Sequence, residues 1–347
     1  MKMRKMPIGI QDFEKLRTEE YVYVDKTEYV YELTRLSTPF FLGRPRRFGK
    51  SLLLSTLRAY FEGKRELFKG LAMERLEKDW MSHPVLHIDL NVASYGSVAD
   101  LEEGLDTNLR MFEEEWELDA QSAGQSPSAR FHKLIRTAAE RSGRKVVVLV
   151  DEYDRPLLQT MERSTPTGQR PGSFPSRSFR TRRMGPSDRL QGSQTGIGPQ
   201  TNKANDDIRA ALKGFYGVLK SADRWLRFVL LTGVTKFSKV SVFSDLNMLR
   251  DISMEEAYAG VCGITARELA DSFGPELAAL AENNGMTLDE AMAEMKKRYD
   301  GYLFAKRGER MFNPFSVLNT LAKREFDYYW FETGTPTFLI EQMKHEG

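Results

Sequence analysis

The feature that most constrains this chain is a change of pattern within residues 39–55. An apolar run ends at Gly43, and a basic loop follows it. The sequence Gly49-Lys50-Ser51 then opens a leucine-rich segment with helical spacing. This order predicts a strand, a loop and a helix. Because the first N–H groups of a helix are unpaired and carry partial positive charge, such a loop is predicted to bind phosphate.

The residue types suit that chemistry. Gly49 lets the backbone approach a ligand, Lys50 reaches the outer phosphates, and the Ser51 hydroxyl can hold Mg²⁺. The pattern G-x-x-x-x-G-K-[ST] is nevertheless incomplete, because Arg44 stands where the first glycine belongs and Gly43 lies one residue too early. Arginine does not take positive φ as cheaply as glycine. On this segment alone, a basic surface loop before an ordinary helix stays an open alternative.

A second informative segment is KVVVLVDE, residues 145–152. Five consecutive apolar residues predict a central parallel strand that is covered on both faces. In a P-loop nucleotidase the strand beside the phosphate loop ends in two acids. Asp151 is then expected to order the Mg²⁺ shell, and Glu152 to take a proton from the attacking water. Together with Gly49-Lys50-Ser51, this segment favours a nucleotide site.

Another buried strand is predicted for residues 226–232, with Thr232 at its carboxyl end. Ligands of open α/β sheets bind at such strand ends, so Thr232 is a candidate sensor of the γ-phosphate, followed by Lys236 and Lys239. A strand-terminal threonine without a role is the alternative. Residues 21–24 alternate like a short strand, and Thr27 is the expected N-cap of a helix over residues 28–35. That segment either contacts the adenine side of a nucleotide or only packs.

Composition narrows the class of protein. A chain of 347 residues that is 41% hydrophobic can bury a large core. Its net charge of +2 is close to neutral and gives no argument for nucleic acid. Cys262 is the single cysteine, so no intramolecular disulfide can form, and a reducing cytoplasm is expected. No apolar run approaches about 18 residues, so we expect neither secretion nor a membrane span.

Residues 163–203 change character to Ser, Gly, Pro, Thr, Gln and Arg, with Asp188 as the single acid. Too few apolar residues offset the entropy of ordering, which predicts a disordered insertion. A basic arm for nucleic acid is the alternative, although aromatic residues for base stacking are almost absent. Further on, Thr265 with Glu268 and Thr287 with Glu290 are spaced like capping boxes at helix starts.

The whole set of motifs resembles a bacterial family usually called AAA-ATPase-like proteins. In chain order they are MPIGIQDFEKLR (6–17), YVDKT (23–27), RPRRFGKS (44–51), VDEYDRPL (150–157), LTGVTKFSKVSVFSDLN (231–247), YDGY (299–302), NPFS (313–316) and YWFETGTPTFL (329–339). The loop of the family is similar to RPRRFGK, so the resemblance removes the objection to Arg44. Family members usually continue into a PD-(D/E)XK nuclease-like domain, whereas this sequence ends at Gly347. They also pass more directly from DEYD to the helix at residues 214–224.

The expected fold is therefore α/β, a three-layer P-loop NTPase with a parallel sheet over residues 1–253 and a mainly helical, lid-like portion over residues 254–347. The expected function is binding and Mg²⁺-dependent hydrolysis of ATP as a switch or motor step. The alternatives are a non-hydrolysing nucleotide-dependent module and a nucleic-acid-binding protein that uses the arginine-rich segments. Oligomeric state and an arginine finger stay undetermined. The candidate site comprises Glu152 and Lys50 for catalysis, Ser51 and Asp151 for Mg²⁺, and Arg46, Arg47, Phe48, Gly49, Lys50, Ser51, Leu52 and Thr232 for the nucleotide.

Overall fold

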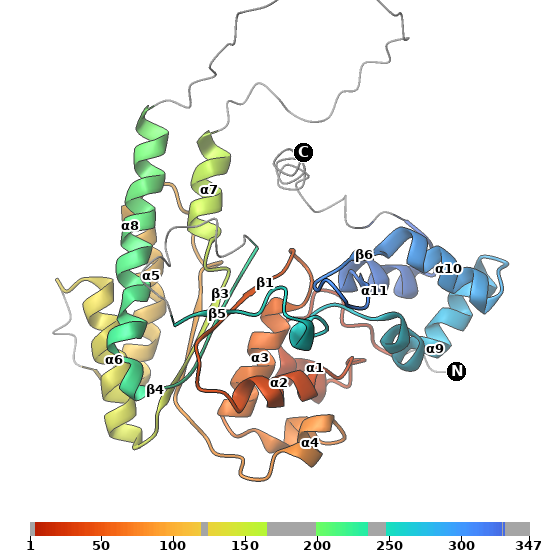
Figure 1. The fold of residues 1–347 in the computed structure, drawn as a ribbon, viewed down its shortest axis with the longest axis horizontal. Helices are drawn as coiled ribbons and strands as arrows, with labels where there is room; N and C mark the ends of the chain where they lie inside the picture. The colour runs from red at the N-terminus through yellow and green to blue at the C-terminus, as the bar shows by residue number, and fades with distance from the viewer. Residues whose placement is uncertain (1–3, 119–123, 165–198, 235–247, 328, 330–347) are drawn as a thin grey trace, which may run out of the picture.

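A five-stranded parallel sheet forms the centre of the molecule (Figure 1). The computed structural model describes residues 4–118, 124–164, 199–234, 248–327 and 329. The order across the sheet is β2-β3-β4-β1-β5, and every neighbouring pair is parallel. The strands are β1 (Phe40–Gly43), β2 (Val85–Asp89), β3 (Val146–Asp151), β4 (Leu226–Gly233) and β5 (Arg250–Asp251).

Helices cover both faces of this sheet, which confirms the predicted three-layer α/β fold (Figure 1). The first face carries α1 (Phe13–Thr18), α2 (Thr27–Thr34), α3 (Lys50–Phe61) and α4 (Ala72–Leu76). The opposite face carries α5 (Val98–Glu115), α6 (Pro127–Ser142), α7 (Arg155–Ser164) and α8 (Pro199–Ser221). Short 3₁₀ turns lie at Arg65–Phe68, Asp223–Trp225 and Glu256–Tyr258.

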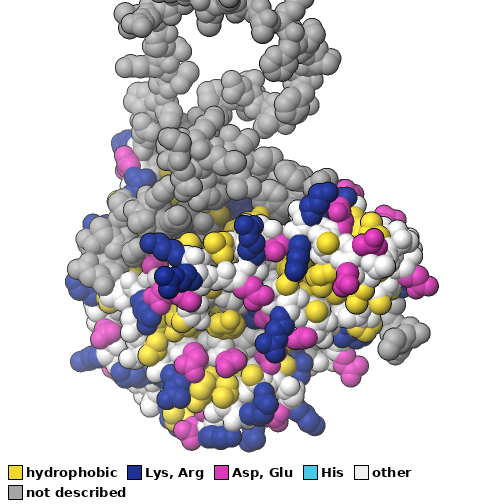
Figure 2. Space-filling view, turned by 45° about the vertical axis from the view of Figure 1, so that its right-hand side comes forward, with side chains coloured by type: hydrophobic (Ala, Val, Ile, Leu, Met, Phe, Trp, Pro, Cys, Tyr) yellow, Lys and Arg dark blue, Asp and Glu magenta, His cyan; other side chains and the backbone are white. Residues whose placement is uncertain are grey.

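The charged side chains of one face of the molecule are of both signs. On the face that Figure 2 presents, Lys and Arg side chains are interspersed with Asp and Glu rather than gathered in one basic area. Within the part of the chain that the structure describes, no helix is both long enough and apolar enough to cross a bilayer.

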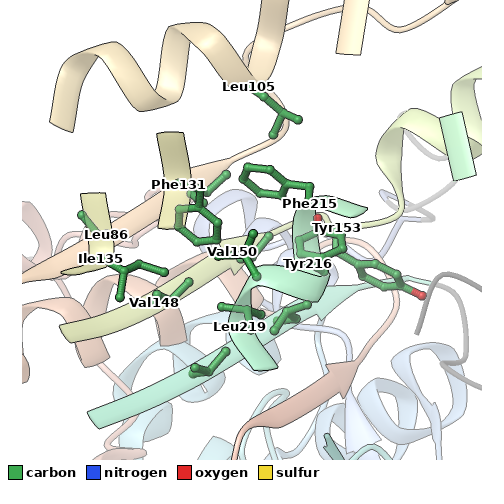
Figure 3. Close-up of a cluster of buried hydrophobic side chains, with 14 of the residues drawn as sticks. Leu86, Leu105, Phe131, Ile135, Val148, Val150, Tyr153, Phe215, Tyr216 and Leu219 are labelled. Atoms are coloured by element: carbon green, nitrogen blue, oxygen red, sulfur yellow. The ribbon is translucent and has the colours of Figure 1, made fainter. Parts of the chain in front are cut away.

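Strand β3 is buried along its whole length, as its apolar run predicts. Val148 and Val150 face the core beneath α5, α6 and α8, and Val147 and Leu149 face the core beneath α3. Figure 3 shows the first of these cores, in which the rings of Phe131 and Phe215 stack with centroids 4.7 Å apart. Side chains alternate between two apolar layers, which explains why the run from Val146 to Val150 is apolar throughout.

The strand order corrects one expectation. We predicted that the strand ending in Asp151 and Glu152 would lie beside β1, but β4 lies between β1 and β3. The chain leaves β1 for the far edge at β2 and then fills back through β3 and β4. Helix α3 after β1 covers one face, whereas α5 to α8 cover the other. The boundary between β1 and β4 is therefore a switch point, where ligands of such sheets bind beyond the carboxyl ends of the strands.

The chain from residue 254 to residue 327 is mainly helical. It contains α9 (Ala266–Asn283), α10 (Leu288–Tyr299) and α11 (Pro314–Lys323), with an antiparallel pair of β6 (Asp300–Tyr302) and β7 (Met311–Phe312). Both capping boxes that were predicted at Thr265 and Thr287 are present. These elements share a core of their own, and Met6, Val22 and Val24 of the N-terminal segment pack against it.

The N-terminal segment differs from the prediction. Residues 21–24 are not a strand, and only an isolated bridge pairs Tyr21 with Lys5. The side chains do alternate, but between two hydrophobic cores. Tyr23 packs against the core beneath α3, whereas Val22 and Val24 pack against the core of the C-terminal helices. Thr27 is the first residue of α2 rather than its N-cap. Its N–H and hydroxyl donate to Asp25 Oδ1 at 2.9 and 2.6 Å.

The predicted insertion over residues 163–203 is wrong at both ends. Helix α7 continues to Ser164, and α8 already begins at Pro199. These helices are joined by a hydrogen bond from Asn205 Nδ2 to the carbonyl of Leu157 at 3.4 Å. Helical hydrogen bonds propagate easily from a packed region, so the helices pass beyond the change in composition. Residues 165–198, on which the rest of that prediction falls, lie outside the described residues.

Candidate functional site

The loop between β1 and α3 comprises residues 44–49. Gly49 is the N-cap of α3 and has φ = +96°, a conformation that favours glycine. A Cβ built there would meet no atom within 4 Å, so open space borders the loop at this point. Arg47 also has positive φ, at +67°, but Arg44 does not. The glycine that is missing from the sequence pattern is therefore not required by the backbone.

Lys50 is held inside this loop. Its side chain is only 4% exposed, and Nζ donates to the carbonyls of Arg44 at 3.1 Å and Pro45 at 3.4 Å. Nζ also lies 3.0 Å from Oε1 of Glu152, which follows β3. The fold thus brings together the two residues that the sequence predicted to be catalytic.

Asp151 and Thr232 form a second pair at the carboxyl ends of β3 and β4. The Thr232 hydroxyl donates to Asp151 Oδ1 at 2.8 Å, and both residues are buried. Beyond them the chain turns at Glu152, which has φ = +52°. Such a conformation costs a non-glycine residue about 1–2 kcal/mol. The N–H of Tyr153 then donates to the carbonyl of Thr232 at 2.9 Å, so the turn at Glu152 is tied to β4.

The remaining predicted residues lie around the loop. Ser51 and Leu52 are half-buried in the first turn of α3. Arg46 and Arg47 are exposed, and the Arg47 guanidinium lies 4.0 Å from the ring centroid of Phe315. Phe48 is buried instead. Its ring packs edge-on against those of Tyr302 and Phe304, with centroids 4.5 and 5.4 Å away.

An apolar pocket adjoins the loop on the side of α3. It has about 630 Å³ of empty space, a figure that includes open solvent. Three separate parts of the chain form it: the N-terminal segment, the loop with α3, and the C-terminal helical part. Its lining residues are Pro7, Leu16, Val22, Tyr23, Val24, Lys26, Phe48, Gly49, Leu52, Leu53, Thr56, Val261, Cys262, Gly263, Ile264, Phe273, Pro314 and Leu318.

Lys26 is a pocket residue that the sequence reasoning did not single out. It is buried, and Nζ donates to both carboxylate oxygens of Glu268 at 2.6 and 2.7 Å. Burial lowers the pKa of Lys26, and the charge of Glu268 opposes that shift. The available signal was the motif YVDKT, in which Lys26 stands between Asp25 and Thr27.

The donor set is suitable for Mg²⁺ but not for a metal held by protein side chains alone. Among the described residues, no group of three or more His, Cys, Asp or Glu side chains is placed to hold a metal ion. Mg²⁺ usually keeps several waters and takes one or two protein ligands together with phosphate oxygens. The carboxylate of Asp151 and the hydroxyl of Ser51 are oxygen ligands of the type that Mg²⁺ takes from a protein.

Two comparisons with known proteins find matches to this chain. A protein-family model described as "Predicted AAA-ATPase" matches residues 7–174 and 197–243, more than half of the chain, and leaves residues 175–196 between its two parts unmatched. An uncharacterised protein in the vnfD 5′ region of Azotobacter chroococcum mcd 1 is 38% identical over 345 residues. That alignment covers 99% of this chain but 57% of the relative.

No solved structure matches the chain significantly. The family model covers more than half of the chain, which is sufficient to assign the family. The chain belongs to the predicted AAA-ATPase family.

Proposed function

We propose that this protein binds ATP with Mg²⁺ and hydrolyses it as a switch or motor step. One observation supports this most directly: Lys50 is the first residue of α3, directly after the β1–α3 loop, and Glu152 lies 3.0 Å from its ammonium group. Family membership supports the binding of a nucleotide. The proposal adds the metal, the hydrolysis step and the residue roles.

In this proposal Lys50 and the N–H groups at the start of α3 hold the phosphates. Ser51 and Asp151 hold Mg²⁺, which neutralises charge on the phosphate oxygens when it is bound. Thr232 keeps the Asp151 carboxylate oriented through its hydroxyl. Glu152 accepts a proton from the attacking water once Lys50 has turned from the carboxylate to the phosphates.

The apolar pocket beside Gly49 and Leu52 is the proposed site of the adenine ring. A flat base suits a cavity that is lined mainly by aromatic and aliphatic side chains. The C-terminal part supplies one wall of this pocket through residues 261–264 and Phe273. We therefore propose that residues 254–347 act as a lid over the base. Cys262 in the same wall is buried and free, which suits the reducing cytoplasm that we propose as the location.

Thermal unfolding with and without ATP and Mg²⁺ tests binding. A ligand that binds only the native state adds about 2.7 kcal/mol at a hundredfold excess over its dissociation constant. Lys50→Ala is expected to lose most of this stabilisation, because it removes a charge-assisted contact of roughly 1.5–3 kcal/mol. Asp151→Asn is expected to reduce the dependence on Mg²⁺. A wild-type melting curve that millimolar ATP with Mg²⁺ does not move would contradict the proposal.

Phosphate release under the same conditions tests hydrolysis. Tight binding without turnover would favour a non-hydrolysing nucleotide-dependent module. Nucleic-acid binding is a separate question, and a steep dependence of affinity on salt would be its mark. Measuring turnover with and without DNA or RNA tests hydrolysis and shows whether nucleic acid changes its rate.

A further inference from the structure

Arg44 is buried at the start of the phosphate loop without a carboxylate among its hydrogen-bond acceptors. It is 1% exposed. Its Nη1 donates to the carbonyls of Ser253 at 2.6 Å and Gly43 at 3.0 Å. Nη2 donates to the carbonyls of Tyr258 at 3.0 Å and Ala259 at 3.4 Å. The side chain therefore joins the loop to residues 253–259.

The flat face of the same guanidinium is also occupied. Its carbon lies 4.1 Å from the ring centroid of Phe304, just beyond β6. Burial lowers the pKa of Arg44 to about 10, so the group stays charged at neutral pH. A buried charge is costly unless hydrogen bonds compensate it. Four carbonyls and an aromatic face supply that compensation only while the loop and the C-terminal part keep their present arrangement.

The backbone of Arg44 connects this anchor to the nucleotide side. Its N–H donates to the carbonyl of Gly233 on β4 at 3.1 Å, and its own carbonyl accepts from Lys50 Nζ at 3.1 Å. Next to it, the N–H of Gly43 donates to Ser253 Oγ at 2.7 Å. A shift of residues 253–259 would thus move the carbonyl that orients the Lys50 ammonium.

We propose that Arg44 is a positioning residue that fastens the phosphate loop to residues 253–259 and so makes nucleotide affinity depend on that segment. This inference rests on the proposed function. It gives Arg44 the role of setting the shape of the loop, which glycine at this position could not perform. The guanidinium itself is directed into the protein, toward the carbonyls of Ser253 and Tyr258.

Arg44→Gly is an informative variant, because it restores the complete G-x-x-x-x-G-K-[ST] pattern while it removes the anchor. We expect its dissociation constant for ATP with Mg²⁺, measured by calorimetry, to rise roughly tenfold or more, since several charge-assisted hydrogen bonds are lost. Guanidinium ion at low millimolar concentration should restore part of the affinity by occupying the vacated position.

Arg130→Gly is the matched control. Arg130 is also buried but pairs with Glu113 and Asp106 away from the loop, so its loss should lower the melting temperature without changing affinity.

Two further measurements keep the test decisive. Ser253→Ala removes the acceptor of the Gly43 N–H and should weaken ATP binding even if Arg44→Gly fails to fold. Hydrogen exchange of the nucleotide-free protein should be faster at residues 46–50 in Ser253→Ala and Arg44→Gly than in the wild type. Unchanged exchange together with wild-type affinity in Arg44→Gly would overturn the role of Arg44, and the same result in Ser253→Ala would show that the contact of Gly43 with Ser253 does not position the loop. A wild-type protein that does not bind ATP would contradict the proposed function, whereas the exchange measurement would still decide the positioning role.

Discussion

Lys50 Nζ and Glu152 Oε1 lie 3.0 Å apart, so the two central charges of the proposed site neutralise each other. Their side chains are 4% and 14% exposed, and such a pair is screened less than one at the surface. In the proposed function, binding of phosphate therefore competes with Glu152 for the ammonium. The same competition frees the Glu152 carboxylate, which links occupancy of the loop to the availability of a general base.

Glu152→Gln is expected to separate hydrolysis from binding. The amide keeps the shape of the side chain but cannot accept the proton, so hydrolysis should fall by about 10²- to 10⁴-fold. Binding of ATP should be retained or become tighter, because Lys50 no longer has to leave a charged partner. Phosphate release and calorimetry measure the two quantities. Glu103→Gln on the exposed face of α5 is a control for the loss of one negative charge, and hydrolysis at the wild-type rate by Glu152→Gln would refute the role of Glu152.

Thr232→Val is expected to destabilise the fold and to disturb the carboxylate that we propose binds the metal. Valine has the same shape but leaves Asp151 Oδ1 without its buried donor. An acceptor left unpaired in the interior costs about 1–3 kcal/mol, which urea denaturation can resolve. Thr232→Ser keeps the hydroxyl and should retain the Mg²⁺ dependence of hydrolysis. If the valine variant has the same Mg²⁺ dependence as the serine variant, Thr232 does not act through Asp151.

The single cysteine reports on the proposed base pocket. Cys262 lines the pocket and is buried, and desolvation raises its pKa, so the thiol should react slowly with a small maleimide near neutral pH. ATP with Mg²⁺ should slow the reaction further by filling the cavity. Mass spectrometry of timed samples measures the rate. Lys50→Ala should show no protection at the same ATP concentration, and equal labelling rates with and without ATP in the wild type would place the base elsewhere.

Acid should destabilise the protein partly through His87. Burial lowers the pKa of His87 below its usual 6.5, and Nε2 is a buried nitrogen without a hydrogen-bond partner. Between the lowered native value and 6.5 the unfolded chain binds more protons than the native one. The stability that depends on neutral His87 is therefore complete above pH 6.5. It is lost as the pH falls from there toward the lowered native pKa.

Replacing His87 by phenylalanine should make the free energy of unfolding less dependent on pH in that window. The change depends on how far the native pKa lies below the unfolded one, with about 1.4 kcal/mol for each tenfold difference between the two acid dissociation constants. Urea denaturation over a series of pH values on both sides of the histidine range measures the slope. Above the histidine range the two proteins should show parallel curves. An unchanged acid slope in the variant would show that other groups account for the loss of stability.

Removing residues 175–196, which the family model leaves unmatched, should preserve folding and nucleotide binding. The deletion lies between α7 and α8, which are already held together through Asn205 and Leu157. Shortening a long connection changes closure entropy only slightly, by about 0.6 kcal/mol for each doubling of length. Melting temperature and ATP affinity of the deleted form test this. A clear fall in the melting temperature or in the affinity for ATP would show that the segment contributes to folding or to binding.

Local sequence determined the parts of the protein that depend on residues close together in the chain. Local patterns predicted three features: the strand that ends at Gly43, the start of α3 at Gly49-Lys50-Ser51, and the buried strand β3. They could do so because side-chain periodicity and helix-start chemistry are local properties. The same holds for the capping boxes at Thr265 and Thr287, where each hydrogen bond spans three residues. Asp151 and Glu152 were found because they end a strand.

Only the tertiary structure decided which distant groups meet. Three relationships depend on how the elements pack. They are the position of β4 between β1 and β3, the pairing of Lys26 with Glu268, which lies 242 residues away in the chain, and the carbonyls that accept hydrogen bonds from Arg44. No local pattern encodes a carbonyl acceptor, because every residue carries one. The sequence therefore identified the loop that we propose binds phosphate, and packing alone determined that Arg44 holds this loop to the C-terminal part.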